Sequence, residues 1–431
     1  MNLLTPSSLG RKNLSNGRPP HRPTDVLIIG GGASGLFCAR VAAQAGLSVI
    51  VLERTASPGR KLSISGGGKA NFSNRQITPQ DYLCHGDPNF CQPALATYTP
   101  AMILEEMRQW HLPVEERSHG QLFLTVPARR LTQILMADCR KLGCHIHCNN
   151  AVDGIRQKHG SFEVYSGDVR WQARSVVLAC GSPAWPQAGG SGAGYRLAQS
   201  LGHELVPPRP ALTPLYLAAS SDGMGFAALA GISLPVRISL EAGSGLDRGW
   251  EDDLLFTHDG ISGPASLKAS LFWQEGMAVL LDFLPQQQVA ALLDSPDAGR
   301  HTARSLLARL LPQRLVDCLL PEAVARRKLA ELSRKQRTII ADAVHRCRIV
   351  PQGRGGLKKA EVCAGGVNTD AIEPATMQSR LIPGLYVIGE LLDVTGLLGG
   401  YNLHWAWASA WAAARHLASA KATAIFNGSS L

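Results

Sequence analysis

Residues 25–35 read DVLIIGGGASG, and this stretch decides how the N-terminal part of the chain folds. Four apolar residues run directly into Gly30, Gly32 and Gly35, which have the spacing G-x-G-x-x-G. Gly30 permits a tight turn, Gly32 lets the backbone approach a pyrophosphate, and Gly35 lets a helix pack closely on a strand. The pattern alone is weak evidence, so its context decides how it is read.

That context is complete. Residues 36–45 have the pattern of a helix, and residues 49–52 form a second apolar strand that ends at Glu53. Free N–H groups at the start of a helix attract phosphate, and an acid at the end of the second strand accepts hydrogen bonds from a ribose. The sequence therefore predicts a βαβ unit that binds a dinucleotide, with Ala33 and Ser34 among the residues that bind it.

Three further segments favour FAD over NAD. Residues 60–74 bring cations, hydroxyls and glycines close behind the βαβ unit, and an apolar strand at 176–179 leads towards Gly181. Near the C-terminus a strand ends in Gly389 and Glu390, an arrangement that contacts the ribityl and pyrophosphate groups in flavoproteins of the two-dinucleotide type. No second complete fingerprint is present, so no separate NAD(P)H domain is predicted.

Composition and charge narrow the class of protein. Hydrophobic residues make up 45% of the 431-residue chain, and no apolar run reaches the roughly 18 residues that span a bilayer. The ten cysteines include no CxxC pair, so we expect reduced thiols, no metal site and a cytoplasmic protein. The net charge of +10 fits either a generally basic soluble protein or one that binds a polyanion such as RNA.

The chain divides by pattern into four parts. We expect an α/β fold in which a Rossmann-like FAD-binding domain carries an inserted β-barrel-like domain and a small helical domain. Basic residues 1–23 are predicted to be a disordered extension, with an organellar transit peptide as the alternative. The predicted domains are residues 24–202 with 371–431 for FAD, 203–285 with 348–370 for the β-barrel, and 286–347 for the helices.

Four motifs resemble those of one bacterial family, the BaiN/YhiN-like or aminoacetone oxidase family of FAD-binding flavoproteins, classed as NAD(P)/FAD-dependent oxidoreductases. The motifs are GRKLSISGGGKAN at 59–71, LFTHDGISGP at 255–264, AEVCAGGV at 360–367 and GELLDVTGLLGGYNLHWAW at 389–407. The resemblance covers residues 25–418. It implies a reductase-like flavoenzyme whose relatives saturate carbon–carbon double bonds, in uridine of large-subunit ribosomal RNA or in bile acids.

Fingerprint and resemblance together name the residues expected to bind FAD. They are Gly30, Gly32, Ala33, Ser34, Gly35, Glu53, Arg54, Arg60, Lys61, Ser65, Gly66, Gly67, Gly68, Asn71, Val152, Gly181, Gly389, Glu390, Gly399, Gly400, Tyr401, Asn402 and Leu403.

The chain departs from the family at two positions. Ala70 stands where relatives usually carry a cysteine, and Cys363 stands where they usually carry threonine. If the loop thiol donates a proton in relatives, this chain needs another donor or lacks the activity.

Reducing a double bond requires a hydride from the flavin and a proton from an acid within hydrogen-bond reach. Tyr401, His404 and Cys363 are the predicted donors, with Asp393 and His258 as further candidates. Each has a structural alternative, such as lining the flavin or capping a helix. Trp405, Trp407 and Trp411 fit core packing behind the flavin, and a stacking platform for RNA bases is the alternative.

Three functions therefore compete. The first is an FAD-dependent reductase that forms dihydrouridine in ribosomal RNA, with NAD(P)H as the electron donor. The second is a small-molecule ene reductase or amine oxidase, and the third is a non-catalytic flavin-binding module. The sequence leaves the substrate, the electron donor and the oligomeric state open.

Overall fold

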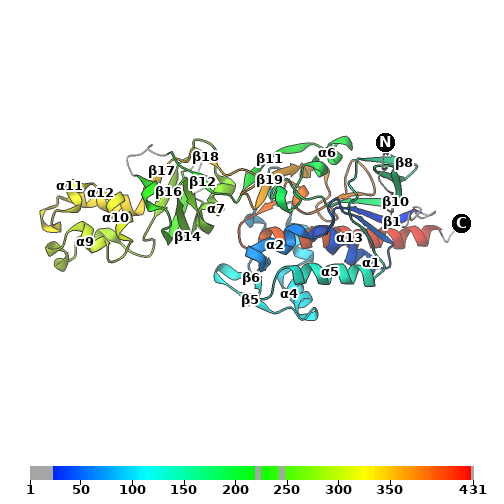
Figure 1. Cartoon of the computed structure of the whole chain (residues 1–431), viewed down its shortest axis with the longest axis horizontal. Coiled ribbons are helices and arrows are strands. Elements are labelled where there is room, and N and C mark those ends of the chain that lie inside the picture. The colour runs from blue at the N-terminus through cyan, green and yellow to red at the C-terminus, as the bar shows by residue number, and fades with distance from the viewer. Residues whose placement is uncertain (1–22, 219–224, 242–247, 429–431) are drawn as a thin grey trace, which may run out of the picture.

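The computed structural model describes residues 23–218, 225–241 and 248–428. The molecule is elongated, with a nucleotide-binding part at one end, an antiparallel sheet in the middle and a group of short helices at the other end (Figure 1). Residues 1–22, which hold nearly all of the predicted basic extension, lie outside the described residues.

A seven-stranded sheet forms the centre of the nucleotide-binding part. Its parallel strands have the order β7-β2-β1-β10-β20, and the first half of β10 instead pairs with an antiparallel hairpin, β9-β8. The central parallel strands β1, β2 and β20 and the last residues of β10 are almost continuous buried apolar runs, as is usual where both faces of a parallel sheet are covered. Their bounds are β1 Thr24–Ile29, β2 Val49–Leu52, β7 His145–His147, β8 Gly154–Lys158, β9 Ser161–Ser166, β10 Val169–Leu178 and β20 Leu385–Val387.

Two helices that are far apart in the sequence pack against each other beside this sheet. They are α1 (Ala33–Gln44), which follows the fingerprint, and α13 (Tyr401–Gly428), which closes the chain. Ten of the twelve residues of α1 are buried, so it is a core helix rather than a surface one. The remaining elements around them are α2 Arg60–Gly68, β3 Asn71–Asn74, β4 Tyr82–Leu83, α3 Gln92–Thr97, α4 Pro100–Gln109, β5 Val114–Glu116, β6 Gln121–Leu124, α5 Arg129–Lys141, α6 Ala193–Ser200 and β21 Thr395–Gly396.

A two-stranded antiparallel ribbon connects the two halves of the molecule. It consists of β11 (Leu205–Ala211) and β19 (Val362–Val367). Beyond it, seven antiparallel strands have the order β17-β16-β13-β14-β15-β12-β18, and α7 (Gly263–Phe272) packs on them. The strands are β12 Leu215–Tyr216, β13 Ser233–Leu240, β14 Gly249–Thr257, β15 Gly260–Ser262, β16 Val279–Asp282, β17 Cys347–Ile349 and β18 Gly353–Arg354.

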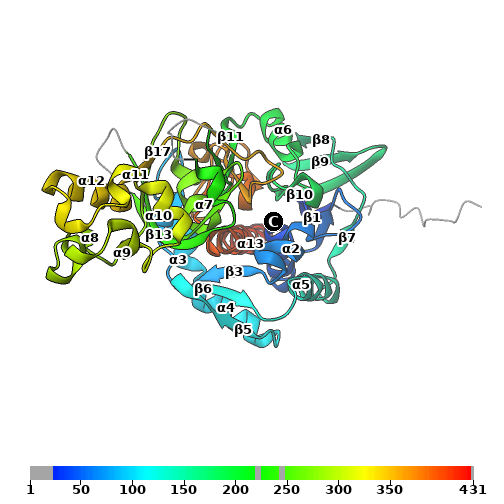
Figure 2. The same ribbon diagram turned by 60° about the vertical axis from the view of Figure 1, so that its left-hand side comes forward.

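The short helices lie at the far end of this sheet in both views (Figure 2). They share one continuous hydrophobic core with it, from Leu215 to Ile349, so sheet and helices form a single packed unit. Their bounds are α8 Val289–Leu293, α9 Ala303–Leu307, α10 Gln313–Leu319, α11 Glu322–Ala325 and α12 Arg334–His345.

The predicted fold class is confirmed: the chain is α/β, its N-terminal βαβ unit is Rossmann-like, and an antiparallel sheet and a helical segment lie beyond it. Within the described residues no helix is both long and apolar enough to cross a membrane. The closing helix extends to Gly428. The predicted β-rich segment also contains a full helix, α7, which begins directly after Ser262.

Candidate functional site

One cavity of about 460 Å³ runs along the junction of the nucleotide-binding part, the ribbon and the antiparallel sheet. The fingerprint and the end of β2 line one stretch of it, and the turn before α13 lines another. Seventeen of the predicted FAD-binding residues lie on its wall: Gly30, Gly32, Ala33, Ser34, Glu53, Arg60, Lys61, Ser65, Gly66, Gly67, Asn71, Gly181, Glu390, Gly399, Gly400, Asn402 and Leu403.

Each fingerprint glycine has a distinct steric role. A Cβ on Gly30, whose φ is +110°, would lie 2.3 Å from the carbonyl oxygen of Ala179, and a Cβ on Gly35 would lie 1.9 Å from the carbonyl oxygen of Gly30. Both positions exclude a side chain because backbone occupies the space. A Cβ on Gly32 would meet nothing within 4 Å, so the space beside it opens into the cavity. This open face next to the start of α1 is where a pyrophosphate fits.

Glu53 is held in place at the end of β2 by backbone and hydroxyl donors. Its Oε2 accepts from the Gly31 N–H at 2.8 Å, and its Oε1 accepts from the N–H and the hydroxyl of Thr55, each at 2.7 Å. The carboxylate is therefore fixed on the cavity wall, where its remaining lone pairs can accept ribose hydroxyls.

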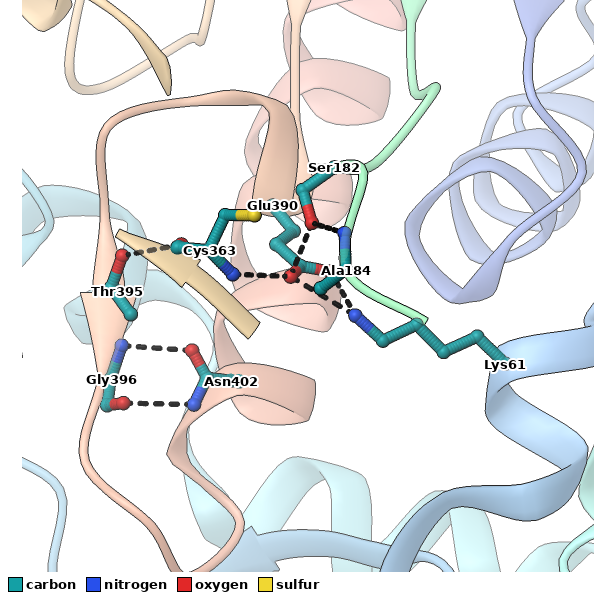
Figure 3. Close-up of polar contacts among 8 residues, drawn as sticks. All are labelled: Lys61, Ser182, Ala184, Cys363, Glu390, Thr395, Gly396 and Asn402. Carbon is teal, nitrogen blue, oxygen red and sulfur yellow. Dashed lines mark hydrogen bonds and ion pairs between the residues drawn. The ribbon is translucent and has the colours of Figure 1, made fainter. Parts of the chain in front are cut away.

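Glu390 connects three segments that are distant in sequence (Figure 3). Lys61 Nζ lies 2.7 Å from its Oε2 and 3.0 Å from its Oε1. Its Oε1 also accepts from the Ser182 hydroxyl at 2.7 Å and from the Cys363 N–H at 3.2 Å. The ion pair is partly buried, and four donor contacts fix the carboxylate in the cavity wall.

The turn before α13 is shaped by glycines and one amide. Gly400 has a φ of +99°, and a Cβ there would lie 2.0 Å from the carbonyl oxygen of Ser73. The Asn402 side chain accepts from the Gly396 N–H at 2.9 Å and donates to the Gly396 carbonyl at 2.8 Å (Figure 3). Since Gly399, Gly400 and Asn402 all line the cavity, the N-terminus of α13 lies against it. Opposite, α2 is kinked at Gly66 and Gly67, which also face the cavity.

These features fit FAD. The bare backbone at Gly32 suits the pyrophosphate, Glu53 suits the adenosine ribose, and Glu390 with Lys61 suits the ribityl chain. The two glycine turns, at 66–67 and 399–400, would hold the ring system without side chains in the way. Leu212, Pro264, Leu397 and Leu398 provide an apolar surface in the same cavity.

Comparison with known proteins agrees with this geometry. Residues 24–416 match the model of the HI0933-like protein Rossmann domain family, and the chain belongs to that family. It is an FAD-dependent oxidoreductase, and its predicted family resemblance is confirmed.

Three relatives align over nearly their whole length. The chain is 36% identical to the ribosomal RNA dihydrouridine synthase of Haemophilus influenzae, over 91% of this chain and 98% of that protein. It is 35% identical to the protein of the same name in Escherichia coli, over 93% and 99%. It is 31% identical to the 3-dehydro-bile acid delta(4,6)-reductase of Clostridium scindens, over 90% and 97%.

Six predicted FAD-binding residues lie off the cavity wall: Gly35, Arg54, Gly68, Val152, Gly389 and Tyr401. Gly35 and Gly389 act through packing; a Cβ on Gly389 would lie 2.6 Å from Ser34 Oγ. Arg54 donates to the carbonyl of Gly189, itself a wall residue, at 2.7 Å.

The wall also contains residues that sequence reasoning missed. Arg117, Gln121 and Phe123 come from the hairpin β5–β6, while Leu212 and Glu361 lie side by side at one end of the ribbon. None of them belongs to a nucleotide-binding pattern, and only the pairing of distant strands brings them to the site.

None of the five predicted proton donors lies on the wall of the cavity among the residues that the structure describes. His404 is fully buried; its Nδ1 lies 2.9 Å from Ser73 Oγ and its Nε2 lies 3.0 Å from the Tyr98 carbonyl oxygen. Burial raises the pKa of the Tyr401 hydroxyl to about 12 and raises the pKa of the buried Cys363 thiol. Asp393 is bound to His85, and His258 is exposed.

Ala70 and the tryptophans also lie away from the cavity. Ala70 is fully buried and absent from the wall, so a thiol at this position would sit in the interior. Trp405 and Trp407 are buried and donate to the carbonyls of Gly389 and Phe72 at 3.1 and 2.9 Å. They pack the core, which leaves their surfaces unavailable for stacking on RNA bases.

Alanine substitutions at Gly35 and Gly32 should separate folding from FAD binding. Gly35→Ala places a methyl against backbone and should lower the free energy of unfolding by about 1–3 kcal/mol or more. Gly32→Ala meets only open space and should leave stability unchanged, yet its methyl enters the pyrophosphate region and should weaken FAD binding about tenfold or more. Urea unfolding of the apoprotein and FAD titration of both variants provide the test. If the two variants lost the same stability and the same FAD affinity, the separate roles of Gly32 and Gly35 would be contradicted.

The buried imidazole of His404 should make stability depend on pH. Burial lowers the pKa of His404 to about 4, whereas an unfolded histidine titrates near 6.5. The unfolded state therefore takes up the proton first as the pH falls, and this group should make the protein about 2 kcal/mol less stable at pH 5 than at pH 7.5. In His404→Gln this fall of about 2 kcal/mol in the free energy of unfolding between pH 7.5 and pH 5 should vanish. In the exposed control His111→Gln the fall should persist. Urea unfolding at both pH values measures it, and identical pH profiles for wild type and His404→Gln would contradict the assignment.

Proposed function

We propose that this protein reduces an activated carbon–carbon double bond. The observation that carries the proposal is the cavity itself, in which the predicted FAD-binding residues and the apolar residues of the ribbon and the second sheet share one wall. The activities for which the three bacterial relatives are named support it, because dihydrouridine synthesis and delta(4,6)-reduction both saturate a double bond. The non-catalytic alternative does not fit an oxidoreductase family, and the amine oxidase alternative does not fit this shared chemistry.

FAD, when bound and reduced, supplies a hydride to one carbon of the double bond. The protein's own residues hold the reactants. The two glycine turns leave room for a planar ring system, while Leu212, Pro264, Leu397 and Leu398 keep water from the reacting carbons. NAD(P)H is the proposed electron donor, acting transiently because the chain has no second nucleotide fingerprint.

Uridine in large-subunit ribosomal RNA is the proposed substrate. The distribution of charge favours it: residues 286–347 contain eleven Lys and Arg against six Asp and Glu, which is half of the chain's net charge of +10. Arg327, Lys328, Arg334 and Lys335 are exposed on this segment. Exposed cations of this kind bind phosphate without reading sequence, and they would hold an RNA whose target base is flipped into the cavity.

A small enone is the second candidate substrate. The apolar part of the cavity favours it, as does the similarity to a bile-acid reductase. The two candidates differ in their dependence on salt, because only the RNA needs contacts to phosphates.

Mapping of modified nucleosides in ribosomal RNA tests the proposed substrate. Cells that lack the gene should lose one dihydrouridine, and the wild-type gene should restore it. Lys328→Gln/Lys335→Gln should weaken RNA binding by severalfold and flatten its salt dependence, because two phosphate contacts are lost. The control Lys141→Gln/Lys158→Gln removes the same charge from exposed sites on the nucleotide-binding part and should bind as wild type. Unchanged dihydrouridine, with salt-independent turnover of a 3-oxo-4,6-diene bile acid, would favour the second candidate.

A further inference from the structure

Only three carboxylates line the cavity in the part of the chain that the structure describes: Glu53, Glu390 and Glu361. Glu53 is held by the Gly31 N–H and by Thr55. Glu390 is paired with Lys61 and accepts hydrogen bonds from two further donors. These two are therefore occupied as hydrogen-bond acceptors and are poor sources of a proton.

Glu361 differs from both. Among the described residues no hydrogen bond or ion pair involves its side chain, although its backbone N–H donates to the carbonyl of Leu212 at 3.2 Å. It stands immediately before β19 and lines the same cavity as Leu212, Pro264 and Leu398. A carboxyl group that accepts no hydrogen bond lacks the donors that would stabilise its anion.

The backbone opposite Glu361 is strained. Leu212, which accepts the Glu361 N–H, has a φ of +50°, a conformation that a bulky residue rarely adopts. Such outliers concentrate at sites where function constrains the chain. Here the strained residue holds the end of β11 against Glu361, and both side chains face the cavity.

We propose that Glu361 is the acid that protonates the substrate, an assignment that rests on the proposed double-bond reduction. The Glu361 O–H bond breaks, and a new C–H bond forms at the carbon that does not receive the hydride. The electron pair of the substrate's π bond is used in this bond, the substrate gains two electrons in total from reduced FAD, and the Glu361 carboxylate regains its proton from water. The missing thiol at position 70 is then no obstacle to catalysis.

The electrostatics of the cavity support this role. Desolvation by the surrounding protein raises the pKa of the Glu361 carboxyl above its ordinary value, whereas the positive charge of Lys61 lowers it. Glu361 is an exposed residue of the cavity wall, so its proton can return from water.

The protonation state of Glu361 can be measured without turnover. In FAD-loaded protein labelled with ¹³C at the glutamate carboxyl, one resonance should be absent from Glu361→Gln and should titrate above the usual glutamate pKa of about 4.3. The control Glu204→Gln removes an exposed carboxylate next to the paired strand β11, outside the cavity, and should retain that resonance. Titration of the Glu361 resonance at or below the usual value would overturn the proposal.

Reoxidation of pre-reduced flavin provides the second measurement. The enzyme is reduced with dithionite and mixed with ribosomal RNA from cells lacking the gene, or with a 3-oxo-4,6-diene bile acid. Glu361→Gln should bind FAD and accept dithionite electrons as wild type but reoxidise at least about 100-fold more slowly, the usual contribution of a general acid. A rate within threefold of wild type would overturn the role of Glu361. Failure of wild type with both probes would instead count against the proposed function, and the titration would still decide whether Glu361 is protonated.

Discussion

The carboxylate of Glu390 is the contact on which the arrangement of the site depends. It binds Lys61 from α2, Ser182 from the loop after β10 and the backbone of Cys363 in β19, so three segments converge on one side chain. Charge-assisted hydrogen bonds of this kind are strong, and removing one partner would leave the other charge unpaired in a partly buried place. The same carboxylate therefore positions the cavity wall and aligns the ribbon with the nucleotide-binding sheet.

The ribbon determines what the cavity can do. Strand β11 ends just before Leu212 and β19 begins just after Glu361, which places an apolar residue and an acid on the same cavity wall as the glycine turns. The nucleotide-binding part provides most of the cavity wall. The antiparallel sheet and its helices add Pro264 of α7 to that wall and, through their positive charge, a surface suited to a polyanion.

The fingerprint could be read from the sequence because its chemistry is local. Gly30, Gly32 and Gly35 lie within one strand–turn–helix unit, in which a Cβ on Gly35 would meet the Gly30 carbonyl oxygen, and Glu53 follows at the end of the next strand. Such short-range patterns named residues of which most lie on the cavity wall. The proton donor could not be found in the same way, because the position of Glu361 depends on pairing between strands about 150 residues apart. His404 shows the converse: its residue type fits acid–base chemistry, but packing on Ser73 and Tyr98 removes it from the cavity.

The chain leaves the nucleotide-binding part along β11 and returns to it along β19. Leu212 and Glu361 are hydrogen-bonded neighbours, so everything between them leaves the nucleotide-binding part and returns to it at a single place. A short turn could join these two residues and close the smaller molecule, because domain insertions are tolerated where both ends meet at one loop. The architecture is that of a nucleotide-binding part that carries one large insertion at a single place, with Glu361 at the point where the inserted segment returns.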